Sequence, residues 1–159
     1  SECQWVWLSI QVIERPPGTG DAQCTMAKAA ALAGAVIVST PQDLALIDAR
    51  KGLNMLRKVN VPLLGIIENM SHFQCTECGA RHEIFGNGGA RAEAAKLGVP
   101  FLGEVPLEME IRATSDEGTP IVASQPDSPH AAHYQAIAEA VLQTLERNAP
   151  KASPKIIVE

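Results

Sequence analysis

Two cysteines separated by two residues, Cys75 and Cys78, have the types and spacing that most clearly predict chemistry in this sequence. Such a C-x-x-C pair offers two thiolates to one metal ion or cluster, and zinc and iron–sulfur sites normally use four ligands. His72 and His82 flank the pair and could complete a zinc site within one loop. A second copy of the chain could instead supply two more cysteines across a two-fold axis. A redox-active pair is less favoured, because that chemistry usually places the pair at the start of a helix.

The segment "ERPPGTGD", residues 14–21, is a second candidate site. Glu14 ends an apolar run, and the prolines and glycines after it predict a rigid turn before a helix. Backbone N–H groups in such a turn can bind a phosphate, and a carboxylate at a strand end can hold Mg²⁺ through water. The alternative is an ordinary turn in which Asp21 caps the helix. The phosphate-binding pattern G-x-x-x-x-G-K-[ST] is absent from the sequence.

The elements that must position these residues alternate between apolar runs and helical patterns. Strands are predicted over 8–14, 35–40, 61–70 and 99–107. Helices are predicted over 22–34, 41–59, 86–98, 108–118 and 128–148. This alternation predicts an α/β fold, with a parallel sheet covered by helices on both faces. Asn69 then falls at the carboxyl end of a strand, where such sheets bind ligands, although a turn-forming asparagine is the plainer interpretation.

Composition limits the classes of function. The chain has 159 residues, of which 46% are hydrophobic and 19% charged, as expected for one globular domain. We assign that domain to residues 1–148, with the cysteine loop at 72–85 and a flexible tail at 149–159. The net charge of −5 and the scattered basic residues argue against a nucleic-acid partner. No apolar run is long enough to span a membrane, and four unevenly spaced cysteines favour a reducing, intracellular compartment.

Long motifs carry a resemblance to a known family. The chain resembles the Mrp/ApbC-type P-loop proteins, iron–sulfur cluster carriers that include a mitochondrial branch assisting complex I assembly. The resemblance rests on "PPGTGDAQCTMAKAAALAGAVIVSTPQDLALIDARKG" and "NMSHFQCTECGARHEIFG", and "GVPFLGEVPLEMEIRATSDEGTPIV" and "SQPDSP" continue it. It covers residues 12–147 without an obvious gap.

Membership implies a deviant P-loop ATPase fold and a homodimer whose C-x-x-C pairs hold one bridging [4Fe–4S] cluster. Cys75 and Cys78 would be the cluster ligands, and the cluster would be delivered to apo-proteins in a nucleotide-dependent way. The resemblance implies that Asn69 contacts the adenine base and that Pro106 lies near the nucleotide. Residues matching the loop that senses the γ-phosphate and Mg²⁺ are Gly18, Thr19, Gly20 and Asp21.

Asp21 and Glu14 are therefore the candidates for a catalytic role, with ATP and Mg²⁺ as cofactors of the full-length family. Family members carry an earlier K-G-G-V-G-K-S phosphate loop, which this sequence does not contain, and they read Asp-Met where this chain has Glu14-Arg15. Without that loop the main electrostatic contribution to phosphoryl transfer is missing. We therefore expect that this chain alone hydrolyses no ATP.

Three interpretations stay open at this point. The first is an iron–sulfur carrier in a bacterial-type cytoplasm or, alternatively, in the mitochondrial matrix. The second is a zinc-stabilised binding or assembly module that uses His72, Cys75, Cys78 and His82. The third is an ATPase that needs a separate chain to supply its phosphate loop.

Overall fold

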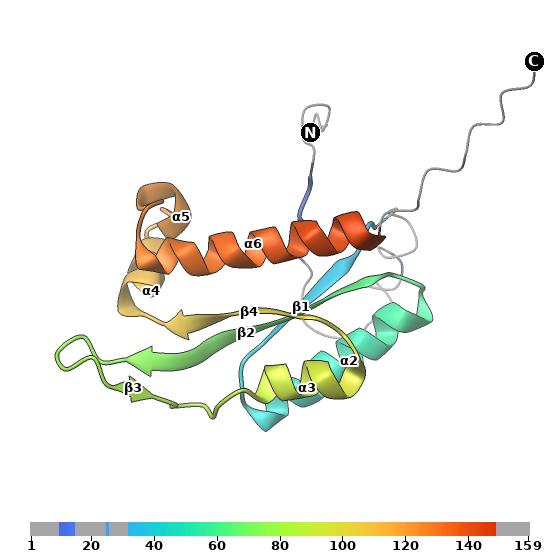
Figure 1. The fold of residues 1–159 in the computed structure, drawn as a ribbon, viewed down its shortest axis with the longest axis horizontal. Coiled ribbons are helices and arrows are strands. Elements are labelled where there is room, and N and C mark those ends of the chain that lie inside the picture. The colour runs from blue at the N-terminus through green and yellow to red at the C-terminus, as the bar shows by residue number, and fades with distance from the viewer. Residues whose placement is uncertain (1–9, 15–24, 26–31, 149–159) are drawn as a thin grey trace, which may run out of the picture.

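The computed structural model describes residues 10–14, 25 and 32–148 (Figure 1). Apart from one two-residue strand and one short helix, the strands and helices of the described chain follow the order that the sequence predicts. In order they are β1 (Ala35–Ser39), α2 (Asp43–Lys58), β2 (Leu63–Gln74), β3 (Arg81–His82), α3 (Gly89–Leu97), β4 (Phe101–Leu107), α4 (Met109–Asp116), α5 (Ile121–Ser124) and α6 (Pro129–Asn148). The short helix α5 was not predicted.

The sheet is built around β2. Strand β1 pairs with one edge of β2 and β4 with the other, both in parallel. The two-residue strand β3 pairs antiparallel with the last residues of β2, so the sheet is mixed rather than purely parallel. In register, Ser39 of β1 and Glu104 of β4 both lie beside Glu68 of β2. The carboxyl ends of the three parallel strands therefore meet at one edge.

Helices cover both faces of the sheet, as predicted. Figure 1 shows α2 and α3 on one face and α4, α5 and α6 on the other. The approach of α6 to β4 is close, because a Cβ built on Gly103 would lie 2.7 Å from Cγ1 of Ile137. A side chain at position 103 would therefore push α6 away from the sheet.

The core is aliphatic, which agrees with the low aromatic content of 4%. Its main cluster lies between α2, α3 and the sheet and consists of Leu46, Leu53, Ile66, Ala90 and Ala94. Helical spacing in α2 predicts one apolar stripe that contains Leu44, Ile47, Leu53 and Leu56. Leu53 and Leu56 are buried as predicted, but Leu44 and Ile47 are 75% and 43% exposed and Leu46 is buried in their place. Docking on the sheet selects one of two apolar stripes that have similar helical spacing.

The structure differs from the sequence predictions, or does not describe them, near the two ends of the chain. Residues 10–14 form no strand and are exposed, so the predicted strand over 8–14 is wrong for the part that the structure describes. The predicted helix over 22–34 lies almost wholly outside the described residues, and the tail at 149–159 lies entirely outside them. Among the described helices, none has an apolar stretch of the length that crossing a membrane requires.

Candidate functional site

The two cysteines occupy the turn of a hairpin. Strand β2 runs past its predicted end to Gln74, and the chain returns as β3, with Phe73 opposite His82. The loop predicted over 72–85 is thus partly a β-hairpin. The backbone N–H of Cys75 donates to the carbonyl of Ala80 at 2.9 Å, and the N–H of Gly79 donates to the carbonyl of Cys75 at 2.8 Å. These bonds close a tight turn that holds the pair at the end of the sheet.

Glycine at position 79 is required by the backbone of this turn. Gly79 has φ of 71°, a left-handed conformation that other residues adopt at a cost. A Cβ built there would meet nothing within 4 Å, so the constraint is conformational rather than steric. The sequence C-T-E-C-G therefore fixes both the spacing of the thiols and the direction in which the chain leaves them.

The surroundings of Cys75 favour the thiolate form of its side chain. Backbone N–H groups of Cys78 and then Glu77 donate to its sulfur, and with the Cys78 thiol they lower the pKa of Cys75 below its usual value. The thiolate is the form that binds metals. Cys75 is half-buried and Cys78 is exposed, and both are free thiols in this structure. The pair is therefore accessible to a cluster and to a second macromolecule.

The two histidines do not join the cysteines. His82 contacts Phe73, with ring centroids 6.4 Å apart. His72 precedes Phe73 in the same strand and so points to the opposite face. Within the described residues, no three His, Cys, Asp or Glu side chains form a group that could hold a metal ion. His72, Cys75, Cys78 and His82, the alternative zinc ligands, are therefore not brought together in the described structure.

His72 belongs instead to a polar cluster that braces the hairpin. Its Nδ1 lies 3.0 Å from the Ser71 hydroxyl and 4.0 Å from Oε1 of Glu104. Nη2 of Arg81 lies 3.9 Å from the same carboxylate oxygen, which links β3 to β4 across β2. Burial, and after it the charge of Arg81, lowers the pKa of His72 despite the opposite effect of Glu104. His72 is thus a neutral part of the scaffold at neutral pH.

A redox role for the pair has little support in this geometry. Redox-active C-x-x-C pairs usually lie at a helix N-terminus, which lowers the pKa of the first thiol. Here the pair lies in a β-turn, and the next helix, α3, begins only at Gly89. The lowered pKa of Cys75 comes from local backbone donors instead.

The residues predicted to contact a nucleotide are only partly described. Asn69 pairs in register with Val105, so Asn69 and Pro106 lie at the same edge of neighbouring strands. Oδ1 of Asn69 accepts a hydrogen bond of 2.9 Å from the N–H of Met70, whose φ is 55°. Asn69 therefore supports a kink in β2, and its amide nitrogen makes no hydrogen bond within the described chain.

The other predicted site residues lie elsewhere. Gly18, Thr19, Gly20 and Asp21 are outside the described residues. Glu14 is described, and it is exposed and outside the sheet rather than at the end of a strand. The structure thus brings together Asn69 and Pro106, and separately Cys75 and Cys78.

Sequence reasoning missed a buried carboxylate close to this edge. Glu68 is only 1% exposed, and its Oε2 accepts a hydrogen bond of 2.7 Å from the N–H of Ala90. A carboxylate at the start of a helix satisfies a free N–H and interacts favourably with the helix dipole. Glu68 thereby ties β2 to α3, the helix that follows the cysteine hairpin. The signal was a glutamate inside an apolar strand, followed later by a helix start rich in glycine.

A second missed contact joins α2 to α3. Nη2 of Arg50 donates to Oε2 of Glu93 at 2.7 Å, and Nε of Arg50 donates to Oε1 of the same carboxylate. Glu93 is 3% exposed, and the hydrogen bonds from Arg50 lower the pKa of its carboxyl group. The two residues are 43 positions apart, so no local pattern could have paired them.

Known relatives cover most of this chain. A protein of Dictyostelium discoideum named "Iron-sulfur cluster transfer protein NUBPL" is 48% identical, covering 99% of this chain and 50% of the relative. An Arabidopsis thaliana protein named "Iron-sulfur protein required for NADH dehydrogenase, mitochondrial" is 52% identical over 89% of this chain and 45% of the relative. The Escherichia coli "Iron-sulfur cluster carrier protein" is 48% identical over 91% and 39%. The chain thus spans about half the length of these relatives, or less.

Structural and family comparisons agree with this similarity. A nucleotide-binding protein of Archaeoglobus fulgidus, solved in complex with ADP, superposes with a TM-score of 0.61 at 39% identity. The superposition covers 71% of this chain and 45% of that protein. Residues 1–142 match the family described as "ParA: NUBPL iron-transfer P-loop NTPase". The fold, the order of its elements and this match together show that the chain belongs to the NUBPL iron-transfer P-loop NTPase family.

Proposed function

We propose that this chain carries a [4Fe–4S] cluster together with a second copy of itself and delivers the cluster to apo-proteins. Each copy contributes Cys75 and Cys78. The observation that carries the proposal is the hairpin turn, where two accessible thiols lie side by side and backbone donors favour the thiolate of Cys75. The names of the Dictyostelium and Escherichia coli relatives support an iron–sulfur cargo.

The need for a second copy follows from the number of ligands. Protein-bound [4Fe–4S] clusters are held by four cysteine thiolates. Each chain offers two at the hairpin, and the described residues bring no third ligand to them. Cys3 and Cys24 lie outside the described residues. A two-fold axis beside the turn doubles the pair and completes the set with identical ligands.

An exposed, shared site also suits transfer. A cluster at the end of a hairpin, with Cys78 on the surface, can be reached by the thiols of an acceptor. Ligand exchange can then proceed one thiolate at a time, because each copy holds only two of the four iron sites. Apo iron–sulfur proteins are therefore the proposed clients.

The full-length protein is proposed to bind ATP with Mg²⁺. The described residues fit a base-binding role, since Asn69 and Pro106 share the carboxyl edge of the sheet and the Asn69 amide nitrogen is available. ATP would supply the free energy of γ-phosphate hydrolysis when bound. Gly18, Thr19, Gly20 and Asp21 are the proposed phosphate-sensing loop, and Asp21 and Glu14 are the proposed catalytic residues. Hydrolysis by this chain alone is not expected.

Nucleotide and cluster are proposed to communicate through β2. Asn69 and Cys75 belong to the same strand and its turn, and the kink at Met70 lies between them. A change at Asn69 on nucleotide binding could therefore alter the direction of the hairpin. The cytoplasmic or mitochondrial location stays a prediction, and the named relatives come from both a bacterium and a plant mitochondrion.

Transfer to an acceptor tests the proposal. The chain would be loaded anaerobically with iron and sulfide, separated from free iron and mixed with an apo-enzyme that needs a [4Fe–4S] cluster. We expect the acceptor to gain activity faster than with equal free iron and sulfide, even when a chelator is present. Cys78→Ser should abolish this gain, whereas Cys24→Ser, its matched control, should retain it. Equal activation by the Cys78→Ser protein would contradict the proposal.

A further inference from the structure

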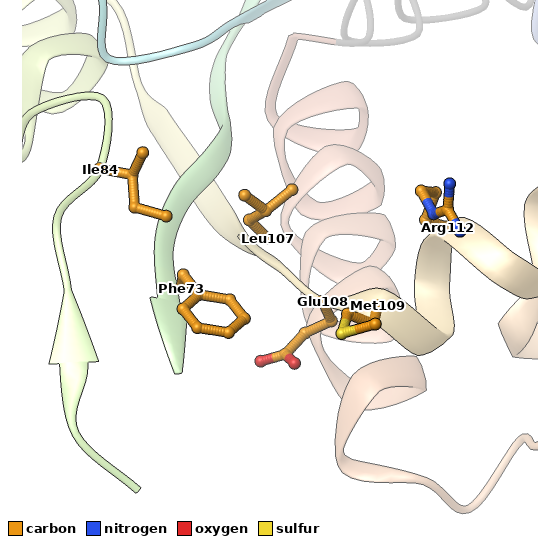
Figure 2. A pocket seen from close by; sticks show the side chains of 6 residues that line it. All are labelled: Phe73, Ile84, Leu107, Glu108, Met109 and Arg112. Carbon is orange, nitrogen blue, oxygen red and sulfur yellow. The ribbon is translucent and has the colours of Figure 1, made fainter. Parts of the chain in front are cut away.

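An apolar groove lies beside the cysteine hairpin, between the end of β2 and the start of α4. Its volume is about 280 Å³. Figure 2 shows its lining, which consists of Phe73, Ile84, Leu107, Glu108, Met109 and Arg112. Phe73 and Leu107 are register partners on neighbouring strands and form its floor.

The same patch also carries projecting apolar side chains. Met109 is 66% exposed and Ile84 is 55% exposed, although both lie next to the half-buried Phe73 and Leu107. Grouped apolar side chains on a surface usually mark a contact with another molecule. The projecting side chains of one copy can fill the groove of a second copy, and the reverse contact forms at the same time. Such a patch is self-complementary, as an interface across a two-fold axis must be.

The charged side chains at the rim of the groove are also complementary to those of a second copy. Glu108 makes no ion pair within 4.0 Å among the residues that the structure describes, and Arg112 is 74% exposed with only a surface ion pair of 3.8 Å to Asp116. Across a two-fold axis, Arg112 of one copy can face Glu108 of the other. The patch is thus complementary to itself in charge as well as in shape.

The groove is also close to the thiols. Phe73 precedes Cys75 by two residues, so the two lie within about 7 Å along an extended strand. A cluster shared by two copies brings their cysteine turns together. The surface beside each turn then approaches the second copy first.

We propose that this groove docks against the same groove of a second copy and so holds the two cysteine turns together. Met109 and Ile84 of one copy fill the hollow over Phe73 and Leu107 of the other. The inference rests on the proposed function, and it adds the surface that makes the cluster site two-fold.

Exposed positions allow a test that leaves the fold intact. Met109→Glu and Ile84→Glu each place a charge in the proposed contact. Leu44→Glu is the matched control, because Leu44 is equally exposed in the first turn of a helix, α2, on the other face of the sheet. Sedimentation of the cluster-loaded chain at several concentrations would give the dimer dissociation constant. We expect each groove variant to raise it at least about tenfold, as for central interface residues, and the control to leave it unchanged.

A charge exchange gives a second test that does not depend on the apolar variants. Glu108→Arg alone and Arg112→Glu alone should each weaken the dimer by about three- to tenfold, because like charges then face each other. The chain that carries both changes should recover most of that loss. Circular dichroism and thermal unfolding would check that every variant folds.

The outcomes separate this inference from the function on which it rests. If the wild-type chain takes up no iron and sulfide, the proposed function is wrong and the inference falls with it. If it holds a cluster as a dimer, but the groove variants match Leu44→Glu and the charge exchange shows no recovery, only the inference is wrong. Groove variants that keep the dimer and slow transfer to the acceptor would also overturn it, because the groove would then receive the client.

Discussion

The face of the sheet under α2 and α3 and the hairpin beyond its carboxyl edge are built on different principles. Under the helices, Leu53 and Ile66 are each 1% exposed, and the buried Glu93 is held by Arg50 from the neighbouring helix. At the hairpin, Cys75 is half-buried and Cys78 is exposed, and backbone hydrogen bonds position both. We expect the first region to determine the stability of the fold and the second to hold the proposed cluster. Substitutions should therefore separate stability from cluster binding.

The largest expected effect is on cluster content. Cys78→Ser leaves one thiolate per chain, so the shared site keeps only half its ligands. Iron and sulfide after anaerobic reconstitution should fall to background, while the free energy of unfolding of the apo-protein changes by less than about 0.5 kcal/mol, as for surface positions. Cys24→Ser should keep full iron and sulfide. A Cys78→Ser protein that still holds a complete cluster would show that the ligands lie elsewhere.

A substitution in the core should have the opposite effect, lowering stability without removing the cluster. Leu53→Ala removes a buried side chain from the cluster between α2, α3 and the sheet, and such changes cost about 2–5 kcal/mol. Denaturant unfolding would measure the loss. The hairpin should be unaffected under native conditions, so the folded variant should reconstitute with the wild-type amount of iron. Loss of iron at a temperature where the variant remains folded would contradict the separation.

A smaller and pH-dependent effect is expected for the ion pair between α2 and α3. Hydrogen bonds from Arg50 lower the pKa of Glu93 below its ordinary value of 4.5. The stabilisation is therefore fully present above about pH 4.5 and is lost as the pH falls through the lower value of the folded state. Glu93→Gln should be less stable than wild type at neutral pH.

Urea unfolding of wild type and Glu93→Gln at a series of pH values would test that sign. The difference in unfolding free energy should shrink in strong acid, where the wild-type carboxyl group is protonated. Asp48→Asn is a suitable control, because Asp48 pairs with Lys51 on the surface, where both side chains are more than 60% exposed. A difference that is constant with pH would mean that the charge of Glu93 contributes nothing.

The smallest effect is expected for His82→Ala. This change removes the ring contact with Phe73, which is worth about 0.5–1.5 kcal/mol at most. Iron and sulfide content should not change, since His82 packs on Phe73 and forms no group with the thiols and a third metal-ligating side chain among the described residues. Metal analysis of the variant and wild type side by side would check this. Loss of all bound metal would instead support a zinc site that includes His82.

The packed region and the hairpin also differ in how far they could be predicted from the sequence. The parallel strands and the helices between them follow from apolar periodicity, which is strongest where elements pack on one another. The face of α2 was predicted correctly at Leu53 and Leu56 but wrongly near the start of the helix, because Leu44 and Leu46 begin two competing stripes and only docking on the sheet selects one. The strand expected over 8–14 has an apolar pattern, but the residues described there have no neighbouring strand with which to pair.

The candidate site could be singled out from the sequence where its residues are close together along the chain. Cys75 and Cys78 are separated by only two residues, and the left-handed Gly79 closes the turn that holds them. The antiparallel hairpin was missed because its polar residues, among them Ser71 and Gln74, conceal the extension of β2. Glu68 was missed for a different reason, since its partner Ala90 is 22 residues away. Contacts of that kind depend on the fold and leave no periodic signal.

Anaerobic reconstitution with a joint analysis of metal, sulfide and molecular mass tests the central claim most directly. We predict a brown protein with about four iron and four sulfide per two chains and the mass of a dimer. Cluster removal by a chelator should abolish the colour. A colourless single chain with one zinc ion, or a single chain that binds a complete cluster alone, would contradict the claim that two copies share the site.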